Sequence, residues 1–268
     1  MVRLFPASVL LAGGLFMTAT VLFMVMPLMV VVASSLTAGN FLTFPPQGFS
    51  LRWYAQALST DAYVRAGWTS LWMASLVTAT SVLIGGAASI AVYRMKGARH
   101  AAMSALLLSP LVLPTIIFGI GLLIVFSRYF GGPSLTGLWL GHTVLAVPYV
   151  VRTTLAVLAN SDPMIEEAAR TMGAGPWRRL WTVTLPQCRV GLLAGGFFAF
   201  NISFDEAVIA LFLRSPGVDT LPLRIYGELE YSSSPGIAAV SAMMIALTVF
   251  LIIIMERIIG IGSVATQK

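Results

Sequence analysis

The sequence predicts an all-α membrane protein, a bundle of six transmembrane helices with both termini in the cytoplasm. Its composition is 58% hydrophobic and only 10% charged, whereas soluble domains carry roughly 25% charged residues. Six long apolar segments recur along the chain, and the Lys and Arg residues gather in alternate loops between them. A chain of 268 residues has room for these segments and their connections, because about 20 residues suffice for one helical span.

The six apolar segments are each long enough to cross about 30 Å of hydrocarbon at about 1.5 Å per residue. Inside hydrocarbon the backbone must satisfy its own hydrogen bonds, so each segment is predicted to be a helix. The run behind Arg3 is longer than the apolar core of a signal peptide, which favours an uncleaved first helix. Gly191 and Gly195 form a pair of small residues that favours close helix packing. The predicted spans are about 8–33, 67–92, 103–127, 137–158, 190–213 and 238–260.

The distribution of positive charge sets the predicted orientation. Loops on the cytoplasmic side of a membrane carry an excess of Lys and Arg. With the N-terminus inside, the inner segments contain Arg3, Arg94, Lys96, Arg99, Arg152, Arg170, Arg178, Arg179, Arg189, Arg257 and Lys268. The outer segments contain the smaller set Arg52, Arg65, Arg128, Arg214 and Arg224. The net charge of +6 is therefore interpreted as a topology signal, and no nucleic-acid partner is expected.

The outer connection at about 34–66 combines chain-breaking residues with aromatic ones. Phe44-Pro45-Pro46-Gln47-Gly48 disfavours regular structure, and Arg52, Trp53 and Tyr54 follow. Trp and Tyr sit well at the boundary between lipid and water, so segment 50–60 is predicted to be a short helix at the membrane surface. A docking site for an external protein is the alternative.

Several kinds of chemistry are not expected on this chain. Cys188 is the single cysteine, so an internal disulfide is impossible. His100 and His142 are the two histidines, which does not suit a His-rich metal site. A phosphate-binding loop needs Gly-Lys followed by Ser or Thr, but Lys96 precedes Gly and Lys268 is the last residue. No catalytic residue, metal or cofactor is therefore predicted here, and an energy source would have to be a separate subunit.

A polar segment at about 159–189 separates the fourth and fifth predicted spans. Asp162 suits a helix N-cap and Pro163 the first helical position. Gly173 suits the helix end, because a left-handed residue there has no Cβ to clash. A second short helix is predicted to follow, with Pro186 ending it. The segment is thus expected to be two short helices with a bend at Gly173.

The residues of this segment resemble the EAA loop of permease subunits of type I ABC importers. The match consists of Glu167-Ala168-Ala169, then Gly173, then Leu185-Pro186 at the family's spacing. In that family the loop lies in the cytoplasm and plugs into a groove of the ATPase subunit. The small side chains leave a low surface, and Glu167 offers a charge to an Arg or a backbone donor. The resemblance implies the ATPase-coupling residues Glu167, Ala168, Ala169, Gly173, Ala174 and Gly175. The alternative from composition alone is a solvated amphipathic loop.

Two acids, Asp205 and Glu206, lie inside the fifth predicted span. A charge at mid-membrane costs about 2.5–3.5 kcal/mol on insertion scales, so such residues usually face a cavity or a partner. Neighbouring helical residues point about 100° apart, so one acid is expected to line a substrate path while the other anchors a neighbouring helix. The candidate substrate-path residues are Asp205, Glu206, Ser203 and Asn201. The alternative is a structural network with Arg214, or with Asn201 and Ser203.

A narrower resemblance runs over nearly the whole chain. The segments Phe44–Gly48, Ser203–Glu206 and Leu221–Tyr226 look like those of the second permease subunit of spermidine/putrescine-type importers. This resemblance implies one transmembrane domain over 1–268 with the type I importer fold, in the inner membrane of a bacterium. It also implies a second permease subunit, two ATPase subunits that bind ATP and Mg, and a periplasmic solute-binding protein.

The expected function is therefore ATP-driven import of a polyamine or related small cation by alternating access. An importer of another solute is an open alternative, because selectivity can rest on the binding protein and the partner permease. A secondary transporter or channel would also use intramembrane acids, but would not explain the spaced polar segment. An intramembrane enzyme is disfavoured, because the chain has no His-Glu-x-x-His motif.

Overall fold

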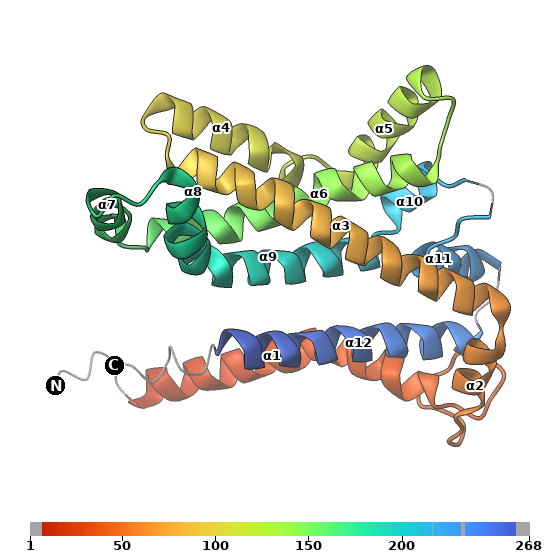
Figure 1. Ribbon diagram of the computed structural model, residues 1–268. Helices are drawn as coiled ribbons and strands as arrows, with labels where there is room; N and C mark the ends of the chain where they lie inside the picture. The colour runs from red at the N-terminus through yellow and green to blue at the C-terminus, as the bar shows by residue number, and fades with distance from the viewer. Residues whose placement is uncertain (1–6, 216, 232–233, 261–268) are drawn as a thin grey trace. The chain divides into compact units, whose positions relative to one another are not determined.

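The computed structural model describes residues 7–215, 217–231 and 234–260, which form helices joined by loops (Figure 1). In this described part, extended pairing is limited to two isolated bridges. Among the described residues, five helices are long and apolar enough to cross a membrane, or six if one bent pair counts as a single span. The predicted all-α architecture with up to six apolar helices is confirmed at this level.

The chain divides into two compact units, which are described separately. The first combines the segments Met1–Asp61 and Gly227–Leu247. It contains α1 (Ala7–Ser35), α2 (Arg52–Ser59) and the beginning of α12 (Pro235–Ile259). The predicted short helix at 50–60 is present as α2.

A closed loop joins α1 to α2 in the first unit. The Ser50 N–H donates to the Leu36 carbonyl at 2.7 Å, and Thr37 pairs with Phe49 in a bridge. Arg52 donates to the Asn40 side chain at 2.6 Å. The loop therefore begins and ends at the same place, next to the end of α1.

The second unit combines the segments Ala62–Tyr226 and Thr248–Lys268. Its centre is formed by the long helices α3 (Asp61–Tyr93), α6 (Leu135–Ala159) and α9 (Leu185–Asp205). Glycines allow α6 and α9 to approach closely: a Cβ on Gly195 would lie 2.7 Å from the Val150 Cα. Val150 and its buried neighbours on α3, α6 and α9 form the core of this unit.

The third predicted span, 103–127, is wrong as a single straight helix. The structure has α4 (Ala98–Leu108) and a short 3-10 turn, then α5 (Thr115–Tyr129), with a bend of 94° between the two helical parts. Pro114 sits at the N-cap of α5. A proline has no N–H to continue the preceding ladder and its ring clashes with the previous turn, so the helix breaks there.

The prediction that Pro186 ends a helix is also wrong. The short helix α8 (Pro176–Arg179) continues through a π-helical turn, η2 (Leu180–Thr184), directly into α9. The Leu185 N–H bonds to the Leu180 carbonyl, five residues back. This wider turn accommodates a proline whose ring would clash in a regular α-helix.

The far end of α9 differs from the predicted span 190–213 as well. The helix ends at Asp205, and a separate short helix, α10 (Val208–Phe212), follows. Helix α10 packs against α5 and α6; a Cβ on Gly119 of α5 would lie 2.6 Å from the Phe212 ring. Residues 205–207, which we name the acidic break, are therefore a helix interruption held by tertiary packing.

Candidate functional site

Residues 163–184, which we name the α7–η2 segment, comprise α7 (Pro163–Thr171), α8 and η2. The start of α7 forms as its sequence predicts. Asp162 has an extended backbone, and its carboxylate accepts the Met164 N–H at 2.8 Å, while Pro163 occupies the first turn. This cap satisfies one of the helix's free N–H groups.

The end of α7 also matches its prediction. Gly173 adopts φ +82°, the left-handed conformation that suits glycine. Its N–H bonds to the Arg170 carbonyl, and the Ala174 N–H bonds to the Ala169 carbonyl, each at 3.0 Å. These two bonds form a Schellman motif, which turns the chain sharply towards α8.

One face of the α7–η2 segment is exposed and formed largely by small side chains. The side chains of Glu167 and Ala168 are exposed, whereas Ala169 and Ala174 are half-buried. Met172, just before the bend, is 86% exposed. An acidic side chain set among small and apolar ones gives a surface that another protein can approach closely.

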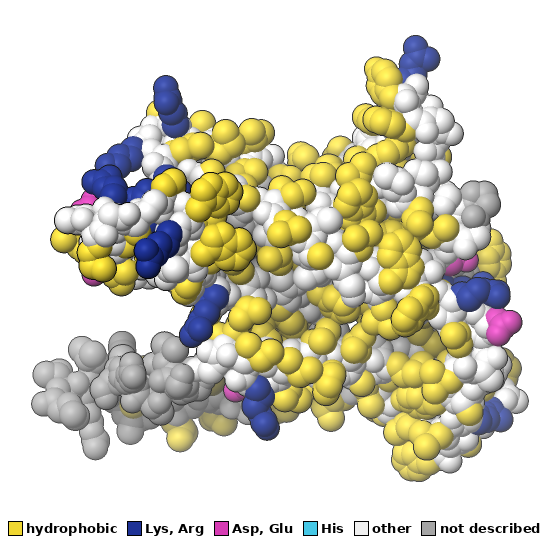
Figure 2. Space-filling view, in the orientation of Figure 1, with side chains coloured by type: hydrophobic (Ala, Val, Ile, Leu, Met, Phe, Trp, Pro, Cys, Tyr) yellow, Lys and Arg dark blue, Asp and Glu magenta, His cyan; other side chains and the backbone are white. Residues whose placement is uncertain are grey.

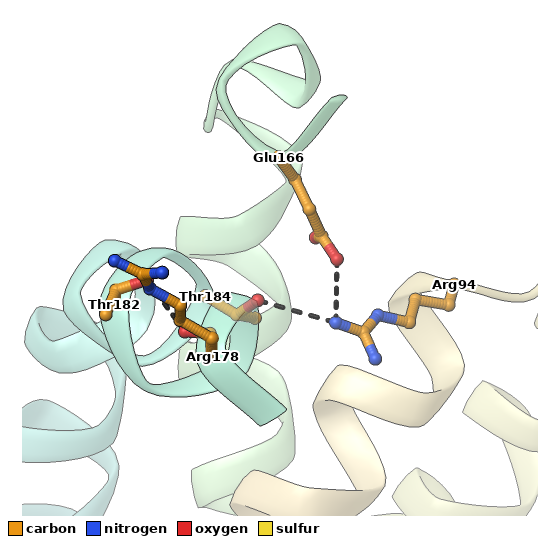
Figure 3. A network of polar contacts seen from close by, with 5 residues as sticks. All are labelled: Arg94, Glu166, Arg178, Thr182 and Thr184. Atoms are coloured by element: carbon orange, nitrogen blue, oxygen red, sulfur yellow. Dashed lines mark hydrogen bonds and ion pairs between the residues drawn. The ribbon is translucent and has the colours of Figure 1, made fainter. Parts of the chain in front are cut away.

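The other acid of this segment, Glu166, points towards Arg94 at the end of α3 (Figure 3). Arg94, which follows α3 directly, donates from Nη2 to Glu166 Oε1 at 2.8 Å and to Thr184 Oγ1 at 3.4 Å. Thr184 belongs to the π-turn and is buried. Sequence reasoning missed Arg94. The available signal was its position at the end of an apolar run, within a basic cluster.

A small apolar cluster lies on the helices that carry this network. Ile90 of α3, Leu158 of α6 and Cys188 of α9 are buried together, and Leu180 and Leu185 pack against them. The π-turn therefore contacts a cluster that includes residues from three long helices.

Positive side chains gather at the end of the second unit that carries α7 and α8 (Figure 2). Figure 2 shows Lys and Arg side chains near the start of α4 and around α7 and α8, with hydrophobic side chains over the middle. The inner-side assignment made from the sequence counts residues of this region, together with Arg3 and Lys268, which lie outside the described residues.

At the acidic break, the two acids have different surroundings. Glu206 Oε1 accepts the N–H groups of Val208 and Ile209 at 2.7 and 3.0 Å, so this carboxylate caps α10. Asp205 is exposed at the last position of α9. Because the helix stops between them, the expected 100° separation along one continuous helix does not apply.

The remaining candidates do not join the acids in one network. Ser203 is buried and its hydroxyl lies 3.0 Å from His142 Nδ1 on α6. The Asn201 amide donates to the Phe197 carbonyl of its own helix at 2.9 Å. Arg214, a candidate partner of the acids in the alternative structural network, pairs with Asp219 at 3.2 Å. His142 was missed, because nothing in the sequence separates a buried polar contact from other positions on α6.

Comparisons with known proteins cover most of the chain. Residues 84–261 match the family described as binding-protein-dependent transport system inner membrane component. The Escherichia coli (strain K12) spermidine/putrescine transport system permease protein PotC is 28% identical over 249 residues, covering 93% of this chain and 94% of that protein. The putrescine transport system permease protein PotI of the same strain is 30% identical, covering 83% and 82%. A putative 2-aminoethylphosphonate transport system permease protein, PhnV of Salmonella typhimurium, is 29% identical, covering 90% and 92%.

Solved structures of similar fold include chains of ABC transporters. A chain of the bacterial alginate ABC transporter, crystallised with an alginate-bound periplasmic protein, gives a TM-score of 0.73 at 13% identity, covering 92% of this chain and 93% of that one. A chain of the inward-facing MetNI methionine ABC transporter gives 0.63 at 20% identity, covering 73% and 94%. At these identities the likeness establishes the fold, which is the one that the polar segment implied.

Proposed function

The chain belongs to the family of binding-protein-dependent transport system inner membrane components, and from this premise we propose that it is a permease subunit that imports polyamines or related small cations at the expense of ATP. The observation that carries the proposal is the α7–η2 segment. Helix α7 is capped at both ends and exposes Glu167 and Ala168. The segment lies within the part of the chain that matches the family.

The proposed partners follow from the family. We expect a second permease, two ATPase subunits that bind ATP and Mg, and a periplasmic solute-binding protein. In this proposal the chain sits in a bacterial inner membrane with both termini in the cytoplasm, it carries no cofactor or metal itself, and nucleic acid is not a partner. The coupling surface would consist of Glu167, Ala168, Ala169, Gly173, Ala174 and Gly175.

The proposed mechanism is alternating access. Closure of the ATPase subunits would displace α7, whose exposed face contacts them. The displacement would reach α3, α6 and α9 through the π-turn, which packs on the cluster around Leu158. Packed interiors move between discrete arrangements rather than deforming continuously. The helices would therefore rock between an inward-open and an outward-open arrangement.

The substrate class follows from the relatives and from the acidic break. PotC and PotI are named for spermidine and putrescine, both polyamines. Asp205 is the exposed acid of the pair, so it is the proposed contact for an ammonium group in the path, while Glu206 holds α10. Asn201 is half-buried one turn before Asp205 on α9. Ser203, also on α9, would support the path through its contact with His142 of α6.

A second candidate function is import of another small solute. It is favoured by PhnV, which is 29% identical to this chain and is named for 2-aminoethylphosphonate. That compound carries an amino group, which an exposed carboxylate would suit, but also an anionic phosphonate, which the same carboxylate would repel.

Uptake of radiolabelled putrescine and spermidine tests the proposal. Cells with and without the chain are compared at matched membrane potential, with ATP present or depleted. ATP-dependent uptake that disappears with the chain supports it. Uptake that persists without ATP but follows the ion gradient would contradict it and favour a secondary transporter. Labelled 2-aminoethylphosphonate, run in parallel, separates the two solute classes.

A further inference from the structure

We propose that Arg94 is a positioning residue for energy coupling, which ties α7 and the π-turn to the Tyr93 end of α3. A displacement of α7 would then be passed to α3 directly and not only through α9. This inference rests on the proposed function, because it assumes that α7 receives the movement of an ATPase subunit.

The geometry places Arg94 at a three-way junction (Figure 3). A single guanidinium nitrogen, Nη2, contacts Glu166 of α7 at 2.8 Å and Thr184 of the π-turn at 3.4 Å. These partners are 72 and 90 residues away along the chain. The contact to Glu166 is charge-assisted, the stronger kind of hydrogen bond. One side chain therefore joins the ends of segments that are distant in sequence.

The backbone of α7 lies closest to η2 and α8. Packing alone would thus make α7 follow the extension of α9. The Arg94–Glu166 pair adds a direct polar link from α7 to a different long helix. Because π-turns often mark functional sites in helices, a link that holds both the π-turn and α7 is well placed to fix the angle between them.

The pair is partly open to solvent, with side-chain exposures of 47% for Arg94 and 23% for Glu166. Ion pairs of this kind are weak and easily broken and reformed. A weak ion pair suits a contact that must form in one step of a transport cycle and break in another. Glu166 and Glu167 then have separate tasks, one towards α3 and one towards the ATPase.

The first test measures the link itself. Backbone amide exchange over residues 163–171 is followed by mass spectrometry on the full transporter complex in nanodiscs. Arg94→Gln and Glu166→Gln are each expected to speed exchange in α7 by about two- to fivefold. Arg99→Gln, an exposed residue of the same basic cluster, is the matched control and should leave exchange unchanged. Equal exchange in the wild type and both variants would overturn the proposal.

The second test measures coupling in the same complex reconstituted into liposomes with the binding protein. The expected result is a ratio of solute imported to ATP hydrolysed that falls about two- to fivefold in Arg94→Gln and in Glu166→Gln, with ATP hydrolysis retained. A residue that merely stabilised the fold would lower both rates together and leave the ratio unchanged, which would overturn the proposal.

The double variant Arg94→Gln with Glu166→Gln decides whether the two residues act through each other. A ratio equal to that of either single variant supports the link, whereas the product of the two single effects would overturn it. Failure of the proposed function looks different, since the wild-type complex would then show no ATP-dependent uptake at all.

Discussion

The chain has two pairs of adjacent acids, Glu166-Glu167 in α7 and Asp205-Glu206 at the acidic break. Both pairs contain one bonded and one exposed carboxylate, but the bonding partners differ. In each pair the carboxylate that is bonded within the protein is half-buried. The inward acid of α7 is held by the guanidinium of Arg94, which comes from another helix. The inward acid of the break is held by two backbone N–H groups just after it.

Counting charges therefore does not distinguish the two acids of a pair, whereas the neighbours of each carboxylate do. The side chains of Glu166 and Glu206 are engaged in bonds that shape the chain. Glu167 and Asp205 are exposed, so they are the members of each pair that can meet a partner or a substrate. Substituting the members of a pair one at a time therefore tests this difference.

The largest expected effect is on Glu167. Glu167→Lys should lower ATP-driven uptake by at least about tenfold, because it places a like charge where a positive partner group is expected. The chain should still reach the membrane, since this side chain is exposed. Uptake in cells, corrected for membrane content by immunoblot, measures the effect. Wild-type uptake from this variant would remove Glu167 from the docking surface.

The second prediction separates the acids of the break. Asp205→Asn should weaken the apparent affinity for putrescine by about tenfold, the size expected for losing one charge-assisted contact of about 1.5 kcal/mol, the lower end of the usual range. Glu206→Gln should have a much smaller effect, because the amide oxygen can still accept the N–H groups of α10. The apparent affinity is read from uptake as a function of putrescine concentration.

A companion variant controls for the structural role of the pair. Glu206→Ala removes the cap and should cost about 0.5–2 kcal/mol of stability, seen as a lower melting temperature in detergent. Unchanged uptake kinetics in the double variant Asp205→Asn with Glu206→Gln would exclude the pair from the substrate path.

The third prediction concerns the helix that joins the two regions. Gly195→Ala places a Cβ 2.6 Å from Thr153 Oγ1 and 2.7 Å from the Val150 Cα. Overpacking of this kind costs about 1–3 kcal/mol, so thermal stability should fall. Gly67→Ala on α3, where a Cβ would meet nothing within 4 Å, is the control. Equal melting temperatures for the two variants would show that α6 and α9 are less tightly packed than this contact requires.

The smallest expected effect is at the bend after α7. Gly173→Ala keeps the open space around the residue but forces a Cβ into φ +82°, at a cost of about 1–2 kcal/mol. Limited proteolysis should cleave the α7–η2 segment faster in this variant. Gly175→Ala, at φ −63°, should behave as the wild type, and a similar rise in cleavage there would show that flexibility rather than handedness matters.

The sequence by itself determined the features that depend on near neighbours in the chain. Apolar segments long enough to span a membrane were predicted from length and hydropathy. The two ends of α7 were predicted as well, because Asp162 and Gly173 act through bonds to residues a few positions away. The spacing from Glu167 to Pro186 indicated the family for the same reason, since it lies within one short stretch of chain.

Only the tertiary structure decided which carboxylate of α7 is engaged and where the helices break. The Arg94–Glu166 pair spans 72 residues and the His142–Ser203 contact spans 61, so no local pattern contains them. Pro114 breaks its helix while Pro186 is absorbed by a π-turn, although both are prolines in apolar surroundings. The physical reason is that a helix interruption costs free energy locally, and whether packing from other helices offsets that cost depends on contacts that form only after the chain has folded.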